Sequence, residues 1–359
     1  MHKHKEMIII LFLLLIAASC PASGKSKIDD YKFHTPAEFI NIMRNGEIAY
    51  TFTIKQNPQP TNLVVTNPEP YLISPYLRIM YDKSGNAELV DDQPEGEVKK
   101  IYELAAQKLK QKDYDAVLKL YEQAMEINSN YFKTWTNMGD TYFWLGNYDK
   151  AEKYLLKAIE LNEVGYQEHY FLAEVYNKTG KNQKALEQIT YAYMLNKQNP
   201  NVKTALSLIL KNNGLKPRED RLKFPFEIKK KSKTECEIIF QEKDGLNWMP
   251  MANCLACWQM EPSFQKLLND EQNVIAVKTI MYKECIANQV ATVASKKQEG
   301  KDVSAKELEL YEMVNGNYLD AILYWEIVGG EAPQIVLLIP KEGQDRIVQY
   351  IKRYVFEKK

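Results

Sequence analysis

The sharpest chemical pattern in this chain is a pair of cysteines three residues apart. Cys254-Leu255-Ala256-Cys257 is followed directly by Trp258. Such a pair can be a thiol-redox centre when it begins a helix, because the helix dipole lowers the pKa of the first thiol. Cysteines of exported proteins also form disulfides, and four thiolates can hold zinc. The chemistry of this pair therefore depends on its setting.

The surroundings of the pair do not favour the redox or the zinc interpretation. Thioredoxin-like proteins place an aromatic residue before the first Cys and Gly-Pro between the two, whereas this chain has Asn253 before Cys254. Cys236 and Cys285 stand singly, although zinc ligands usually come in close pairs. Cys254, Cys257 and Trp258 also fit one buried helix face. We assign no residue to a metal site, and leave disulfide bonding, redox activity, zinc binding and simple core packing open for Cys254 and Cys257; a thiol-redox or zinc-binding C-terminal domain held by the repeats is the alternative function.

Histidine chemistry and nucleotide phosphate binding have little support. Beyond the first 20 residues the chain contains only His34 and His169. Histidine-dependent nucleophilic catalysis needs a histidine with positioned partners, and neither residue has a recognisable setting. There is no Gly-rich phosphate loop of the Walker or dinucleotide type. We therefore predict no catalytic residue and no cofactor, with a thiol oxidoreductase as the alternative.

The elements that position these residues are dominated by a repeat of 34 residues. Three sets of small or apolar residues recur at this interval, and they are Leu104, Met138 and Leu172; Ala105, Gly139 and Ala173; and Ala124, Ala158 and Ala192. Within one unit they follow helical spacing, and Gly146-Asn147 breaks the chain between two helices. A fixed period of this length indicates a stack of helical units.

Period and residue types together resemble the tetratricopeptide repeat (TPR), a helix–turn–helix unit that stacks into a solenoid. The central unit, 132–162, follows the family pattern most faithfully. His169 stands where the family has Trp, so we expect it to be a packing residue. The resemblance implies about three repeats and a capping helix over 98–214, with the helix from Pro200 to Asn213 covering the last repeat.

The resemblance also implies which residues face the concave groove in which the family binds partners. Carried over position by position, they are Tyr102, Ala106, Thr136, Asp140, Phe143, Trp144, Tyr170, Glu174 and Asn177. Aromatic residues there would be binding anchors, unless Phe143 and Trp144 pack on the flanking domains. One branch of the family clamps a peptide carboxylate with Lys, Asn and Arg. Of those positions only Asn137 matches, so we expect no such clamp.

The N-terminus reads as an export signal of the lipoprotein type. Residues 1–19 combine a basic start, an uncharged apolar run and small residues directly before Cys20. This resembles the bacterial lipobox, in which the cysteine is acylated and becomes the new N-terminus. Residues 20–30 then form a flexible tether. We expect lipidation of Cys20 and a location in the bacterial cell envelope, at the outer membrane.

Charge excludes one class of partner. The whole chain has 47 basic and 47 acidic residues, and removing residues 1–19, with two lysines and one glutamate, leaves a formal charge of −1. Nucleic-acid binding depends on a surplus of Lys and Arg facing phosphates. We therefore expect no nucleic-acid partner.

The flanks of the solenoid resemble no known family. Residues 31–93 read as a small mixed α/β segment, and residues 217–359 as a mostly α-helical domain. The fold class is therefore mainly α. The sequence favours a non-catalytic scaffold whose solenoid mediates protein–protein interaction, without naming the protein or peptide that it binds.

Overall fold

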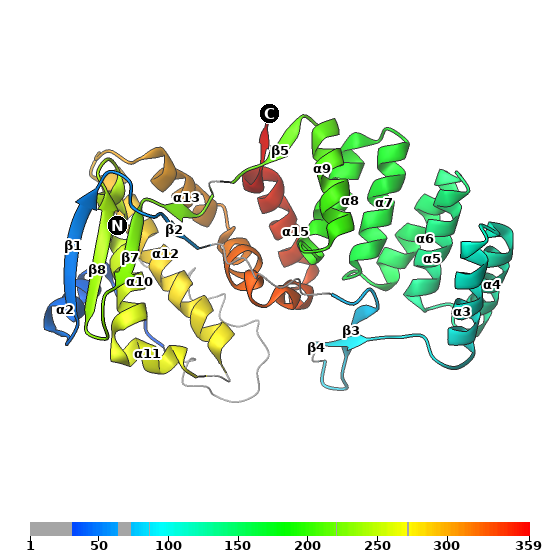
Figure 1. Cartoon of the computed structure of the whole chain (residues 1–359), viewed down its shortest axis with the longest axis horizontal. Helices are drawn as coiled ribbons and strands as arrows, with labels where there is room; N and C mark the ends of the chain where they lie inside the picture. Colours follow the sequence, from blue (N-terminus) through cyan, green and yellow to red (C-terminus); the bar gives the residue numbers. More distant parts are fainter. Residues whose placement is uncertain (1–30, 64–72, 86, 220, 271–272) are drawn as a thin grey trace, which may run out of the picture.

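The computed structural model describes residues 31–63, 73–85, 87–219, 221–270 and 273–359. Figure 1 shows an elongated molecule with a row of paired helices at one end and a sheet covered by helices at the other. The predicted leader, Cys20 and the tether lie outside the described residues. Among the helices described, none has the length and apolar character needed to cross a bilayer.

The row consists of helix pairs that continue the sequence period. The pairs are α3 (Gly96–Lys110) with α4 (Tyr114–Ile127), α5 (Phe132–Trp144) with α6 (Tyr148–Leu161), and α7 (Tyr166–Lys178) with α8 (Asn182–Leu195), followed by α9 (Pro200–Asn212). The predicted solenoid of three units with a capping helix is confirmed. Each pair packs on the next, and α9 packs on α8.

The turns after the first helix of each pair and after α9 share one backbone conformation. Lys112, Gly146, Gly180 and Gly214 follow each other at intervals of 34 residues, with φ angles of 57°, 74°, 73° and 67°. Glycine enters this left-handed region freely, whereas an L side chain is disfavoured there. Three of the four turns therefore use glycine, and Lys112 is held in the same conformation by the repeat geometry.

Small residues let the two helices of each unit approach closely. Ala105 and Ala173 are fully buried, and a Cβ added to Gly139 would lie 2.6 Å from Leu155 Cγ. Leu104 departs from its period, because it is 44% exposed while Met138 is buried. The reason is its place in α3, which ends the row (Figure 1), so no preceding repeat covers it.

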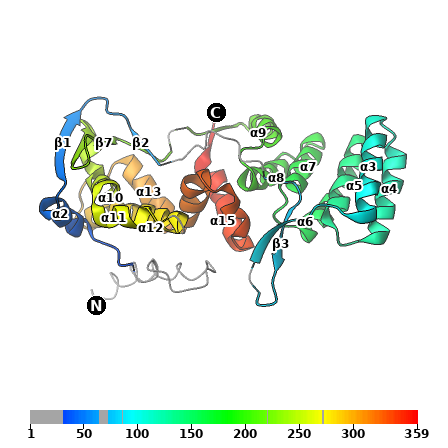
Figure 2. The same cartoon turned by 60° about the horizontal axis from the view of Figure 1, so that its bottom comes forward.

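The segment 31–93, which we predicted as one small unit, is divided between two places. It contains α2 (Pro36–Asn45), β1 (Ala49–Lys55), β2 (Thr61–Asn62), β3 (Leu77–Tyr81) and β4 (Ala87–Asp91). β1 joins a sheet with β7 (Phe226–Lys230) and β8 (Glu235–Gln241) in the order β1-β8-β7, parallel to β8. The β3–β4 hairpin lies instead between the repeats and the C-terminal domain (Figures 1 and 2).

The C-terminal domain is mostly helical, as predicted. Its main helices are α10 (Met249–Met260), α11 (Pro262–Leu268), α12 (Val274–Gln298), α13 (Ala305–Asn315), α14 (Leu319–Ala321) and α15 (Lys341–Tyr350). Shorter elements are β6 (Lys223–Phe224), η2 (Gly245–Trp248), η3 (Ile322–Ile327), η4 (Val328–Gly330), η5 (Pro333–Leu338) and η6 (Ile351–Val355), and β5 (Leu215–Pro217) pairs with β9 (Phe356–Lys358). α10 is apolar on nearly all sides because it lies between the sheet and α12.

The C-terminal domain docks on the third repeat. α15 and η5 pack on α8, and the Tyr191 hydroxyl donates to Asp345 Oδ1 at 2.6 Å. Lys197 Nζ donates to the backbone oxygen of Trp325 at 2.7 Å. These contacts bury the outer helix of the last repeat, so the solenoid is capped by α9 and by this domain together.

Replacing Gly139 by Leu should destabilise the solenoid. The added side chain would overlap Leu155, and overpacking a close helix contact costs typically about 1–3 kcal/mol. Thermal melting followed by helical circular dichroism measures the effect. The matched control is Ala106→Leu on the exposed side of α3, which should melt like the wild type. Equal melting temperatures for the two variants would contradict the close approach at Gly139.

Candidate partner-binding surface

The first helices of the three repeats, α3, α5 and α7, lie side by side and form one surface. Tyr102 of α3 shares a hydrogen bond of 2.7 Å with Thr134 of α5. Thr136 of α5 hydrogen-bonds to Glu168 of α7. We call the surface that these helices present the first-helix surface. All nine positions that the sequence assigned to the groove lie on these three helices.

Two of the predicted contact residues are not available to a partner. Thr136 is fully buried, because its hydroxyl is engaged by Glu168 and lies 3.2 Å from the backbone oxygen of Phe132. The prediction that Thr136 contacts a partner is therefore wrong. Tyr102 is half-buried, with its hydroxyl on Thr134 and its ring edge-on to Tyr121 at 5.6 Å. It serves the packing of the first repeat on the second.

The chain's own N-terminal segment occupies the beginning of the first-helix surface. Lys133 Nζ donates to the backbone oxygen of Pro75 at 3.4 Å and lies 5.4 Å from the centre of the Tyr76 ring. Asn162 Nδ2 donates to the backbone oxygen of Leu77 at 3.0 Å. Pro75, Tyr76 and the start of β3 are thus held where α5 and α7 begin. This end of the surface is covered by the chain itself.

Sequence reasoning missed the polar group that holds this segment. Lys133 is only 4% exposed and hydrogen-bonds to Gln167 of the next repeat. Burial lowers the pKa of Lys133, while the charges of Glu168 and Asp140 raise it. A lysine and a glutamate in successive repeats, at Lys133 and Glu168, were the available signal. Nothing in the sequence pointed to Tyr76.

The open part of the first-helix surface is aromatic and acidic. Trp144 is 62% exposed, and its ring lies edge-on to Phe143 at 5.8 Å. Phe143 also contacts Tyr148 of the same repeat at 5.7 Å, so the pair packs within its own unit rather than on a flanking domain. Tyr170, half-buried on α7, carries the aromatic surface toward the third repeat.

Two carboxylates lie among these rings. Burial raises the pKa of Asp140 to about 6, although a hydrogen bond from the Trp144 side chain and the charge of Lys133 lower it. Burial likewise raises the pKa of Glu174, and Lys178 lowers it. Both charges act on Tyr170, whose pKa rises through burial first and then through Glu174 and Asp140. Within the described residues neither carboxylate forms a salt bridge.

The last two predicted positions lie at the edges of the surface. Asn177 Oδ1 accepts a hydrogen bond of 2.9 Å from Asn212 of α9, so this side chain joins α7 to the capping helix. Ala106 is exposed on α3. The structure therefore brings together Asp140, Phe143, Trp144, Tyr170 and Glu174, which we call the open cluster.

The comparison with known families decides the nature of this solenoid. A family model described as "Tetratricopeptide repeat" matches residues 132–163, which span the α5–α6 pair. The pairs on either side have similar helix lengths and the same turn conformation at the same interval. The array is a TPR solenoid. Repeats of this kind generally mediate protein–protein interaction.

Solved structures that are similar to part of this chain include two TPR domains and MamA. The first TPR of Spaghetti (RPAP3), bound to the HSP90 peptide SRMEEVD, is 20% identical over 32% of this chain and 90% of its own, with a TM-score of 0.31. The Arabidopsis OM64 TPR domain is 18% identical over 32% and 94%, with a TM-score of 0.31. MamA is 14% identical over 55% and 96%, with a TM-score of 0.29.

Outside the TPR, the cysteine pair is placed for structure rather than redox chemistry. Cys254 of α10 is bonded to Cys285 of α12, with Cα atoms 5.3 Å apart, and Cys257 is free. Burial raises the pKa of the Cys257 thiol to about 12. A redox-active Cys-x-x-Cys needs an accessible thiolate, and both residues are fully buried. The described residues contain no cluster of three or more metal-ligating side chains.

Both histidines of the described residues, His34 and His169, are used in contacts within the protein. His169 stacks on Tyr191 at 4.9 Å, and burial lowers its pKa to about 4, so it is neutral at pH 7. His34 Nδ1 lies 3.0 Å from Glu284 Oε1, in the contact between the N-terminal segment and α12.

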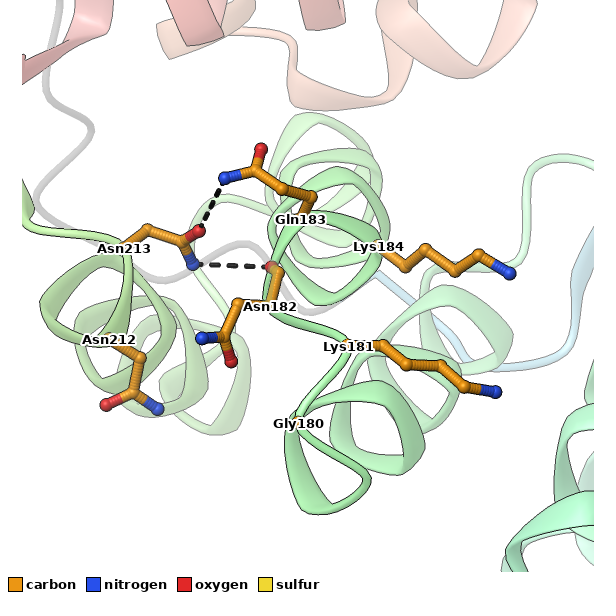
Figure 3. Close-up of a pocket in the computed structure, with 7 residues that line it drawn as sticks. All are labelled: Gly180, Lys181, Asn182, Gln183, Lys184, Asn212 and Asn213. Carbon is orange, nitrogen blue, oxygen red and sulfur yellow. Dashed lines mark hydrogen bonds between the residues drawn. The ribbon is translucent and has the colours of Figure 1, made fainter.

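An open hollow at the α7–α8 turn and the C-terminal end of α9 is a weaker candidate. It is lined by Gly180, Lys181, Asn182, Gln183, Lys184, Asn212 and Asn213 (Figure 3). Lys181 and Lys184 point away from the asparagines, toward Glu152, at 2.8 and 4.0 Å. Gln183 donates to Asn213 at 3.1 Å. Most of its polar side chains already have partners, so the hollow offers little to a ligand.

The raised pKa of Asp140 predicts a pH-dependent stability. In the unfolded chain the Asp140 carboxyl has its ordinary pKa of 3.8, whereas in the folded chain its pKa is about 6. The contribution of Asp140 to the free energy of unfolding should therefore fall as the pH rises from 4 to 6 and stay level above, whereas His169, whose pKa is lowered to about 4, contributes a rise over the same range. Asp140→Asn should remove this fall and stabilise the protein at pH 7 by roughly 1–3 kcal/mol. Urea unfolding at pH 4, 5, 6 and 7 measures it.

The control for this titration is Asp302→Asn, at an exposed loop position, which should unfold like the wild type at every pH. A wild-type stability with the same pH profile as Asp140→Asn would show that Asp140 is not the group that titrates.

Proposed function

We propose that this protein is a lipid-anchored, non-catalytic protein of the bacterial cell envelope, which binds a protein or peptide through the open cluster of its TPR solenoid. The observation that carries the binding role is the exposed Trp144 beside two half-buried carboxylates without a salt bridge. Exposed aromatics at the centre of a surface are typical binding anchors, and a desolvated carboxylate gains most from a cationic partner.

The chemistry of the open cluster describes the partner. A Lys or Arg side chain would neutralise Asp140 and Glu174, and its stem or an apolar neighbour would pack on Trp144 and Tyr170. A carboxylate-terminated peptide, which one TPR branch clamps with basic residues, would meet acidic groups here. We therefore propose a segment that carries a cationic residue next to an apolar one.

Two features support an envelope location. The sequence up to Cys20 has the form of a lipoprotein leader. The Cys254–Cys285 bond belongs to the kind of cross-link that persists in oxidising, exported compartments rather than in the cytosol. The anchored end would be near Tyr31, on the C-terminal domain, so the repeats extend away from it (Figure 1).

Replacing Phe143 and Trp144 together by Ala should weaken partner capture at least tenfold while helicity stays intact. The two rings supply the exposed apolar area of the open cluster, and removing an aromatic anchor typically costs about 2 kcal/mol or more of binding free energy. Purified protein is immobilised, and envelope extract is passed over it. Bound proteins are identified by mass spectrometry, and the affinity of each for wild type and variant is then measured.

Two further variants make this experiment specific. Asp140→Asn with Glu174→Gln should weaken capture of the same partner, and wild-type capture should strengthen as the pH rises through about 6. Leu208→Ala, at an exposed apolar site on α9, is the control and should bind normally. A partner retained equally by all variants would refute this surface. Empty capture would favour a solenoid that holds only its own hairpin and C-terminal domain.

The mature protein should begin at an acylated Cys20 and stay with membranes through a high-salt wash. Two or more acyl chains anchor a protein stably, whereas salt removes electrostatic adherents. Detergent should release it, and Cys20→Ser should make it soluble or leave residues 1–19 attached. Intact-mass analysis of the detergent extract measures the modification. An unmodified N-terminus at Pro21 or beyond, or release by salt alone, would contradict lipid anchoring.

A further inference from the structure

The strand β1 forms the edge of the three-stranded sheet and leaves apolar side chains uncovered. It lies beside β8 only, at the end of the molecule opposite the first repeat (Figure 1). Phe52 and Ile54 are 53% and 55% exposed. No proline interrupts the strand between Ala49 and Lys55. Soluble proteins usually protect such an edge, because it is a template for pairing with another strand.

The backbone groups of alternate β1 residues point away from β8. Ala49 N–H donates to Thr234, and the Lys55 carbonyl accepts from Glu242. In a parallel ladder these contacts assign residues 49, 51, 53 and 55 to β8. Tyr50, Phe52 and Ile54 therefore present their N–H and C=O groups at the free edge. Within the described residues no backbone hydrogen bond occupies that edge.

The sequence of β1 is symmetric about Phe52. Tyr50-Thr51-Phe52-Thr53-Ile54 reads as apolar, Thr, aromatic, Thr, apolar in either direction. If two copies paired antiparallel with Phe52 opposite Phe52, Thr51 would face Thr53, and Tyr50 would face Ile54. Thr–Thr, aromatic–aromatic and aromatic–β-branched pairs are the favourable cross-strand combinations. A two-fold interface requires such self-complementarity.

The positions of the charged residues and of the free backbone groups agree with this register. The residues that point outward, 50, 52 and 54, would be opposite one another, so each antiparallel pair could exchange both of its hydrogen bonds. Lys55 would face Ala49 of the other copy, with the exposed Glu47 two residues before it. Opposite charges at both ends favour the antiparallel arrangement, because a parallel pairing would bring Lys55 next to Lys55.

We propose that β1 is a self-association strand, and that two copies of this chain join their sheets into one six-stranded sheet by antiparallel pairing about Phe52. The contact uses one strand and few side chains, so the dimer is weak and transient in solution. It leaves the open cluster of each solenoid free, and it stands independently of the proposed partner and of lipid anchoring.

Cysteine cross-linking tests the register directly. Full chains carrying Cys20→Ser are given either Thr51→Cys or Thr53→Cys, and a size tag distinguishes the two; Cys236 and Cys257 are buried and Cys254–Cys285 is bonded. In the proposed register Thr51 faces Thr53 of the other copy, within disulfide reach. Mild oxidation of the mixture should give mixed covalent dimers, at least tenfold more than either variant alone.

Three outcomes would overturn the proposal. They are no covalent dimer from the mixture, equal dimer from each variant alone, or dimer mainly from Thr51→Cys alone, which indicates parallel pairing. Circular dichroism checks that both variants fold. If β1 paired with a strand of a different protein instead of a second copy, the purified mixture would give no covalent dimer, which is the first of these outcomes.

Sedimentation equilibrium of chains carrying only Cys20→Ser provides a measurement that needs no cross-link. Phe52→Lys places a charge at the two-fold axis, where both copies would carry it, and should raise the dimer dissociation constant at least tenfold. The matched control, Leu208→Lys, changes an apolar residue of similar exposure on α9 and should leave self-association unchanged. Association unaffected by Phe52→Lys, or absent at the highest soluble concentration, contradicts the proposal.

Discussion

The parallel pairing of β1 with β8 is the constraint on which the rest of the structure depends. The hydroxyl of Thr51 on β1 donates to the backbone oxygen of Cys236 on β8, and these two residues are 185 positions apart in the chain. Parallel neighbours always need a crossover connection, and here the crossover contains the whole TPR solenoid. The first and last parts of the chain therefore build one domain, and the repeats are inserted into it. Closing so long a connection costs loop entropy and slows folding, although the cost grows only slowly with length. The contacts of α8 with α15 and the short β5–β9 pair offset part of that entropy cost, because they fix the inserted solenoid to the domain that contains it.

This topology explains which parts of the fold the sequence predicted. The repeats were predictable because their information is local: Gly139, Gly146 and the alanines at 34-residue intervals specify helix pairs that contact only their neighbours. The capping boxes at Thr35 and Ser304, which begin α2 and α13, are equally local, because each depends on a Glu only three residues further along. The division of residues 31–93 was not predictable, because the sequence of a single strand such as β1 does not indicate which distant strand it pairs with. Linear domain boundaries fail whenever one domain is inserted into another, and here they separated β1 from β8.

The candidate surface was predicted in part, for a similar reason. Position-by-position transfer from the TPR pattern placed Asp140, Phe143, Trp144, Tyr170 and Glu174 on one surface, since those positions depend only on helical geometry. It failed at Thr136, because the family pattern takes no account of what else in a particular chain covers the repeat. In this protein Tyr76, Lys133 and Glu168 fill that end of the surface. The cysteines show the same limit: the spacing of Cys254 and Cys257 suggested a pair, whereas the bond is made to Cys285 on a different helix.

Glu284 decides how a force on the N-terminus would enter the protein. Its carboxylate accepts from the Tyr31 hydroxyl at 2.9 Å, from the His34 backbone N–H at 2.6 Å and from Trp258 Nε1 at 2.7 Å, and it is fully buried. The next residue, Cys285, is bonded to α10. If Cys20 carries lipid, the eleven residues 20–30 reach at most about 40 Å from the membrane. Any pull along them is then borne by a carboxylate with three donors on a helix cross-linked to its neighbour. Breaking it would leave a buried charge unpaired, which is strongly unfavourable.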